Sequence, residues 1–490
     1  MWTAAYLNGQ IANTAQGGDP TSHRRPAIPF IYFPSFLLFL KQSCPISLSA
    51  TLFWLVITDM DRWNRTRALT SLVCLGLMTL ADCVTDSLLL TFASDSQMQP
   101  GSWNLRTCAI VLGGVSDVIG QSVLGYVLST RSKYCAMIIN TTSILAAAIV
   151  TLSSVLLGHN RSLMAATGGG GCHGSVFLML AILHSQKPQH YFAYHYMTGA
   201  IGVLTQSLGS LSASRLSRHS HILPGVFSGL CCLMAYSVIL FLKKMDADTE
   251  EPSQDESRPL LSHQQQILRV DDAPASQMAV AGYISRPGGS GSPLRSQDLK
   301  FLPIVFVLMG FCKSTRPLFT TYIQHRHGVS PTEAEHLWLL RTVLSVALLV
   351  FAGLYTAYIK EPDYFNHVQA KITILFISAG ALAIGLPGSY NTITIALIIN
   401  TIGVVTDLSI LAFASTLLER RDAGSVLMLI ASIESFGTLA GVGALYPLYQ
   451  LSLRDSLPFL AGGIPYYICG TLYAVAAVII WSVGPKPATE

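Results

Sequence analysis

The sequence predicts an all-α membrane protein with twelve transmembrane helices arranged as two six-helix bundles. Of its 490 residues, 51% are hydrophobic and only 11% are charged, and the mean hydropathy is +0.48. Soluble proteins carry about a quarter charged residues. The apolar segments are near the length, about 20 residues, that crosses a bilayer, where a helix satisfies its own backbone. A polar stretch, 244–299, separates two apolar blocks, 68–243 and 300–484.

The predicted spans follow one another at short intervals. Six precede the polar stretch, at 68–93, 106–129, 134–158, 162–183, 191–213 and 222–242. Six more follow it, at 301–323, 336–359, 370–387, 392–418, 423–449 and 462–483. Residues 485–490 form a short tail.

The N-terminal region, 1–67, contains two apolar segments, 28–40 and 46–60, separated by Lys41, Gln42 and Pro45. Each segment is too short to cross a bilayer alone. An interfacial hairpin, a poorly formed extra span and sequence included by a faulty gene prediction all remain open for this region.

Residues 244–299 are predicted to be a disordered cytoplasmic linker, because they mix acids, bases, Pro, Gly, Ser and Gln without a long apolar run. Placing the linker in the cytoplasm gives that side about twice as many loop Lys and Arg residues as the other side, as the positive-inside rule requires. We expect the plasma membrane, with the vacuolar or endosomal membrane as the alternative.

Two loop motifs are weaker signals. Glu256, Leu260 and Leu261 fit an acidic dileucine sorting pattern, which also occurs by chance. Asn160 begins an Asn-Arg-Ser glycosylation sequon on the predicted outer side, although it lies only a few residues from the lipid.

Several function classes find no support in the sequence. The net charge of +4 gives no case for nucleic-acid binding, and no phosphate-binding loop of an ATPase is present. The ten cysteines are scattered through apolar segments without a Cys-x-x-Cys spacing, so neither disulfides nor a metal site is expected. We expect no cofactor.

Ionisable residues inside predicted spans are the candidate substrate or coupling residues, because a charge in the bilayer is costly unless it serves a function. They are Asp82, Asp86, Asp117, Lys313, Arg316, Arg341, Asp407 and Glu434. At about 1.5 Å of rise per residue, four of them lie near the midplane: Asp82, Asp117, Lys313 and Glu434. Asp86 and Arg341 lie roughly 5–10 Å below the external face. Midplane acids from both halves beside a midplane base predict a central site between the halves.

Two pairs share a helix face. Asp82 and Asp86 could load and release a proton as the cavity opens to each side, or could merely face a wet vestibule. Lys313 and Arg316 could hold an anionic group or neutralise acids opposite, or could form a structural interhelical ion pair. His173 and His195 are predicted to be hydrogen-bonded packing residues.

Four consecutive glycines, Gly168, Gly169, Gly170 and Gly171, lie in the predicted fourth span. In a membrane, glycines let neighbouring helices approach closely, or let a helix bend. We expect close packing here.

The chain resembles the major facilitator superfamily over residues 68–484. The superfamily signature between spans two and three corresponds to the segment from Gly125 to Lys133, with Ser129 in place of the usual Asp. More narrowly, the chain is similar to fungal facilitators found beside metabolite-producing enzymes. That similarity rests on the four glycines, on LLRTVLS around Arg341 and on SIESFGTLAG around Glu434. It implies a functional or gating role for Arg341 and Glu434. The Gly-Pro motif of drug/proton antiporters is missing from span five.

The predicted function is therefore secondary active transport of a small organic molecule, with protons as the candidate coupling ion. Efflux of a secondary metabolite or toxic compound is expected, and nutrient uptake is the alternative direction. A membrane sensor that binds without transport, or a polytopic membrane enzyme such as a lipid acyltransferase, are the alternative classes; we expect no enzymatic activity.

Overall fold

The computed structural model describes residues 62–95, 105–157, 172–184, 191–250, 294–315, 318–359, 362–416, 423–452 and 462–483. All fourteen regular elements in these ranges are helices. The apolar segments before residue 61, the sequon at Asn160, the glycines at 168–171, the dileucine pattern in the linker and Arg316 lie outside the described residues.

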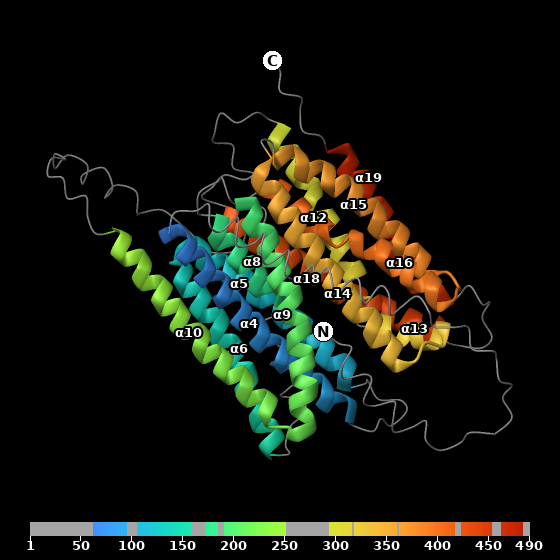
Figure 1. Cartoon of the computed structure of the whole chain (residues 1–490), viewed down its shortest axis with the longest axis horizontal. Helices are drawn as coiled ribbons and strands as arrows, with labels where there is room; N and C mark the ends of the chain where they lie inside the picture. Colours follow the sequence, from blue (N-terminus) through green and yellow to red (C-terminus); the bar gives the residue numbers. More distant parts are fainter. Residues whose placement is uncertain are drawn as a thin grey trace, which may run out of the picture.

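The helices fall into two groups, one before and one after the predicted linker (Figure 1). The first group comprises α4 (Arg62–Asp95), α5 (Leu105–Thr130), α6 (Lys133–Leu157), α8 (Cys172–His184), α9 (Tyr191–His219) and α10 (Leu223–Glu250). The second comprises α12 (Leu294–Lys313), α13 (Phe319–His327), α14 (Pro331–Tyr358), α15 (Pro362–Gly385), α16 (Tyr390–Ile402), α17 (Val405–Thr416), α18 (Ala423–Ser452) and α19 (Ile464–Ser482).

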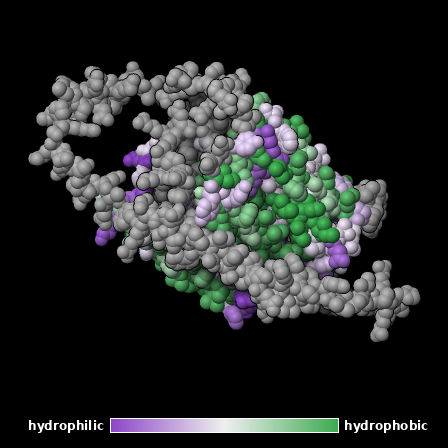
Figure 2. All heavy atoms as spheres, turned by 45° about the horizontal axis from the view of Figure 1, so that its top comes forward, coloured by the Kyte–Doolittle hydropathy of each residue, from purple (hydrophilic) through white to green (hydrophobic). Residues whose placement is uncertain are grey.

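Eight segments in the described part of the chain are long and apolar enough to cross a membrane. Their outward faces keep large apolar side chains at the surface, among them Leu240, Phe351 and Val478, which are 61%, 65% and 71% exposed. Figure 2 shows a broad hydrophobic area on one face, with hydrophilic residues at its margins. Such a surface is stable only against lipid or another apolar partner, so the structure is that of a multi-pass membrane protein.

An ion-pair cluster joins three helices of the first group at the end where the linker begins. Asp246 of α10 accepts from Arg67 of α4 at 2.8 Å and from Lys133 of α6 at 2.7 Å. The Tyr134 hydroxyl also donates to Asp246. Arg67 takes part because α4 begins at Arg62, six residues before the predicted span. We call this end of the molecule, from which α10 leaves and where α12 begins, the linker end.

Two of the predicted spans contain a helix that is interrupted near its middle. The span predicted at 301–323 divides into α12 and α13, and the span predicted at 392–418 divides into α16 and α17. The first interruption falls between Lys313 and Phe319, and the sequence has a proline, Pro317, in this interval; proline lacks the N–H donor that a continuing helix requires. The second interruption falls at Gly403 and Val404, and Gly403 lies directly against the backbone of Ile377 on α15.

Helix α14 begins five residues before its predicted start. Ser330 and Glu333 form a reciprocal capping box, and Pro331 occupies the first helical position. Arg341 therefore lies roughly 15 Å along α14 from its first residue, Pro331. The Ser-Pro-x-Glu pattern was the sequence signal for this earlier start.

The two groups of helices contact each other chiefly through α5 with α18 and α9 with α14. Hydrogen bonds between side chains bridge the two groups, among them one between Ser207 of α9 and Thr342 of α14 at 3.0 Å. The Ser122 hydroxyl of α5 donates to Ser432 of α18 at 3.2 Å, and Ser435 of α18 donates to Gln121 of α5 at 3.0 Å.

The largest polar contact between the groups surrounds Tyr196 of α9. Its hydroxyl lies 2.7 Å from Asn366 Oδ1 and 2.9 Å from Gln369 Oε1 on α15, and 3.0 Å from Ser409 Oγ on α17. Because a hydroxyl carries one proton, at least one of the two amides must present its NH₂ group to the tyrosine oxygen. The preceding residue, His195, donates from Nε2 to the Leu408 carbonyl oxygen at 3.0 Å. These contacts close the two halves together at the linker end.

Candidate substrate and coupling site

Three of the predicted residues form one buried charge cluster. The Lys313 ammonium forms ion pairs with the carboxylates of Asp407 and Glu434. The Lys313 and Glu434 side chains are 9% and 3% exposed, and that of Asp407 is 20% exposed. With all three groups ionised, the cluster carries a net charge of −1. We call these three residues the Lys313 cluster.

The two helix interruptions place this cluster. Lys313 is the last residue of α12, and Asp407 lies in the first turn of α17. A cation at a helix C-terminus and an anion at a helix N-terminus are each stabilised by the helix dipole. Discontinuous helices that point their ends at a buried charged site near mid-membrane are typical of secondary transporters.

Glycines bring Glu434 to Lys313. A Cβ on Gly310 of α12 would overlap the Glu434 carbonyl oxygen, and Cβ atoms on Gly437 and Gly441 of α18 would overlap the carbonyl oxygens of Val307 and Phe311. The backbones of α12 and α18 therefore lie in direct contact, and the Thr438 hydroxyl donates across it to the Gly310 carbonyl at 3.1 Å. Sequence reasoning missed these glycines, although Gly437 and Gly441 show the small-x-x-x-small spacing of membrane helix contacts.

A small cavity lies on one side of Lys313, beneath the interruption between α12 and α13. Its polar lining comes from Lys313, Thr315, Arg341, Asn400 and Tyr466. Its volume is about 20 Å³, which is room for about one water molecule. Arg341 lies over the ring of Trp338, with 5.5 Å between its guanidinium carbon and the ring centroid.

The acids of the first half lie elsewhere. Asp82 of α4 is buried inside that half, near Cys232 of α10. Asp86, on the same helix, and Asp117 of α5 are partly buried. Lys313 thus pairs with two acids of its own half. The interhelical ion pair predicted as one reading of Lys313 is present.

The two histidines named in the sequence, His195 and His173, are not part of the Lys313 cluster. His195 is fully buried and hydrogen-bonded at the contact between the halves, as expected for a packing histidine. His173 lies at the start of α8.

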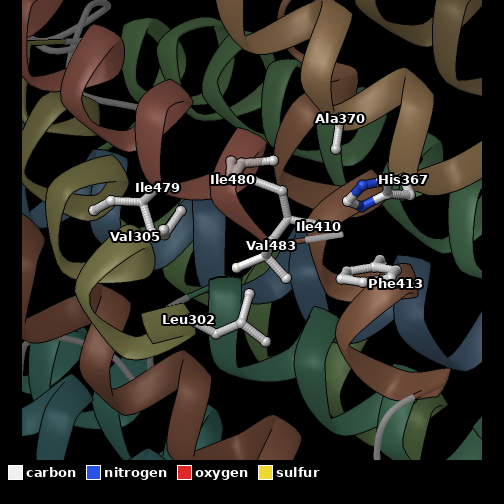
Figure 3. Close-up of a pocket in the computed structure, with 9 residues that line it drawn as sticks. All are labelled: Leu302, Val305, His367, Ala370, Ile410, Phe413, Ile479, Ile480 and Val483. Atoms are coloured by element: carbon white, nitrogen blue, oxygen red, sulfur yellow. The ribbon is translucent and has the colours of Figure 1, made fainter. Parts of the chain in front are cut away.

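A second cavity, toward the linker end of the second half, is almost entirely apolar. Figure 3 shows His367 at one edge beside Phe413, across from the aliphatic side chains of Leu302, Val305 and Ile480. The volume is about 10 Å³, close to the smallest that holds a water molecule. With a single polar side chain, this cavity lacks the convergent polar groups of a substrate site.

Comparison with solved structures identifies the architecture. The human organic anion transporter MFSD10 is 15% identical, with 86% of this chain and 100% of that chain covered and a TM-score of 0.60. The proton:xylose symporter XylE is 12% identical, with 86% and 95% covered and a TM-score of 0.59. FucP, a major facilitator superfamily transporter in the outward conformation, is 12% identical, with 86% and 99% covered and a TM-score of 0.58.

The chain has the major facilitator fold. Its two groups of helices correspond to the two halves of that fold, and the Lys313 cluster lies in the second half. No protein-family model and no curated protein matches the sequence.

Proposed function

We propose that the protein is a secondary active transporter that moves a small organic molecule by alternating access. The observation that carries this proposal is the Lys313 cluster, a buried set of three charges held at two helix interruptions within a major facilitator fold. A purely structural role would not require charges at this depth, because apolar residues of similar volume stabilise a buried contact as well or better.

The topology we propose has twelve spans, with α12 and α13 as the seventh and α16 and α17 as the tenth. The linker, 244–299, lies in the cytoplasm between bundles at 68–243 and 300–484. The contacts between the halves at the linker end, between Ser122 and Ser432 and around Tyr196, support a state closed toward the cytoplasm. Two of the similar structures, FucP and a bacterial ferroportin homologue, are described as outward-facing.

Protons are the proposed coupling ion. The Lys313 cluster carries one negative charge in excess, and one proton on Glu434 or Asp407 would make it neutral. A switch between charged and neutral forms can favour one conformation over the other, which coupling requires. The xylose symporter with the same fold is proton-coupled. Asp82 and Asp86 are secondary candidates.

The proposed direction of transport and the proposed membrane both rest on sequence motifs. The resemblance to fungal facilitators beside metabolite-producing enzymes supports efflux of a secondary metabolite or toxic compound across the plasma membrane. The similar structures do not decide the substrate, since their names include an organic anion, iron and xylose.

Two measurements distinguish transport of a ligand from binding alone. Compounds that raise the thermal stability of the purified protein identify ligands, and their exchange across proteoliposomes then measures transport. A disulfide between Ser122→Cys and Ser432→Cys, whose parent hydroxyls lie 3.2 Å apart, should lock the linker end and stop exchange until it is reduced. Ligands that bind but never exchange would identify a sensor instead.

A further inference from the structure

We propose that the cavity beside Lys313 binds a carboxylate group, so that the substrate is a small organic anion with an apolar body. This inference rests on the proposed function and names the substrate class of the same site.

The cavity separates the cations of the site from its acids. Lys313 of α12 and Arg341 of α14 both line it. Among the described residues, no Asp or Glu lines it; Asp407 and Glu434, which pair with Lys313 from α17 and α18, are not lining residues. Because Lys313 is already paired with two carboxylates, Arg341 supplies the positive charge that favours an anion in the cavity.

Tyr466 supplies a third donor. It is 4% exposed and lines the cavity, and within the described part of the chain its hydroxyl has no hydrogen-bond partner. Leaving a buried hydroxyl without a partner costs about 1–3 kcal/mol, so such a group indicates a missing ligand or water. Arg341 lines the same cavity as Tyr466.

The donor set fits a carboxylate. A guanidinium holds a carboxylate through two parallel N–H donors, and its face can stack on an aromatic ring while its edge stays available. Arg341 lines the cavity, and its guanidinium carbon lies 5.5 Å from the centroid of the Trp338 ring. Asn400 is less suitable as a donor, because its amide already donates to the Ile377 carbonyl at 3.1 Å.

The rest of the lining suits an apolar body. Phe319, Ile377, Ile384 and Tyr473 complete the wall around the charged groups. With a volume of about 20 Å³, the cavity now has room for about one water molecule. A carboxylate would displace that water, and its body requires the interruption between α12 and α13 to widen. Binding would thus favour a conformation different from the one described here.

The test compares benzoate with benzamide, which has nearly the same shape without the charge, and with benzylamine, which has the opposite charge. Thermal stability of the full chain in detergent gives apparent affinities. We expect stabilisation by benzoate alone. Arg341→Gln should weaken benzoate binding about tenfold, and Tyr466→Phe about three- to tenfold, in line with the loss of one charged or neutral hydrogen bond.

Tyr322→Phe is the matched control. Its hydroxyl is also buried but donates to the Ile384 carbonyl at 3.1 Å, and it does not line the cavity. Benzoate affinity should survive this change. Equal stabilisation by benzamide, preference for benzylamine, absence of benzoate binding or full affinity in both cavity variants would each overturn the proposal. If benzoate binds but never exchanges across proteoliposomes, the carboxylate site stands and the proposed transport function is wrong. If only uncharged compounds exchange, the transport function stands and the carboxylate site is wrong.

Discussion

Gly310 of α12 packs directly against the backbone carbonyl of Glu434 on α18, with no room for a side chain at position 310. The same contact fixes how far α12 and α18 are shifted along their axes relative to each other. Lys313 follows Gly310 by three residues, almost one helical turn. A backbone contact therefore determines where the ammonium of Lys313 meets the carboxylate of Glu434.

The first prediction is that Gly310→Ala strongly lowers stability. The added methyl would overlap backbone atoms, which cannot move away as a side-chain end can, and overpacking of this kind costs about 1–3 kcal/mol or more. The measurement is the thermal midpoint and yield of purified protein. Gly443→Ala is the control, since no atom lies within 4 Å of a Cβ there although it is on the same helix as Glu434. Similar midpoints for both variants would refute the proposed backbone contact.

The positions of the buried charges could be predicted from the sequence, but their partners could not. Hydropathy predicts where spans lie, and Asp407 and Glu434 stand out within them. Nothing in a hydropathy pattern indicates that helices are interrupted at Lys313 and Gly403. The interruptions bring Asp407 to Lys313, whereas Asp82, equally deep by count, lies inside the other half. Depth along a helix is a local property, and pairing depends on rotation and on close contacts such as that at Gly310.

A second prediction concerns the closure at the linker end. Tyr196→Phe removes the hydroxyl that lies among Asn366, Gln369 and Ser409, and leaves buried amides with one partner fewer. A loss of about 1–2 kcal/mol would shift the equilibrium away from the closed linker end roughly tenfold.

The measurement is the rate of disulfide formation between Ser122→Cys and Ser432→Cys on a background without native cysteines. We expect slower cross-linking in Tyr196→Phe than in the parent. Tyr355→Phe is the control, because Tyr355 is 47% exposed on α14 and contacts neighbouring aromatic rings. An unchanged rate in Tyr196→Phe would show that this hydroxyl does not hold the halves together.

A third prediction tests the charge balance of the Lys313 cluster. Lys313→Met leaves two carboxylates near each other without a cation, and breaking a buried ion pair from one side costs about 3–5 kcal/mol. Combining Lys313→Met with Asp407→Asn and Glu434→Gln removes all three charges and should restore much of the lost thermal stability. If the triple variant is no more stable than Lys313→Met, the loss comes from packing of the lysine stem.

The last prediction concerns coupling. Glu434→Gln keeps the shape of the side chain and fixes its neutral form, so Lys313 and Asp407 remain as a balanced pair and the fold should persist. The cluster can then no longer change its charge by gaining a proton at position 434. We expect the variant to bind substrate and to exchange it downhill, but to lose accumulation driven by a pH gradient. Uptake into proteoliposomes with and without an imposed gradient measures this, using whichever ligand the wild type moves. Asp407→Asn is the comparison, because it leaves the same net charge but keeps the more buried carboxylate of Glu434. If Glu434→Gln responds to the gradient as the wild type does while Asp407→Asn does not, Asp407 is the coupling residue and Glu434 serves to hold Lys313 in place.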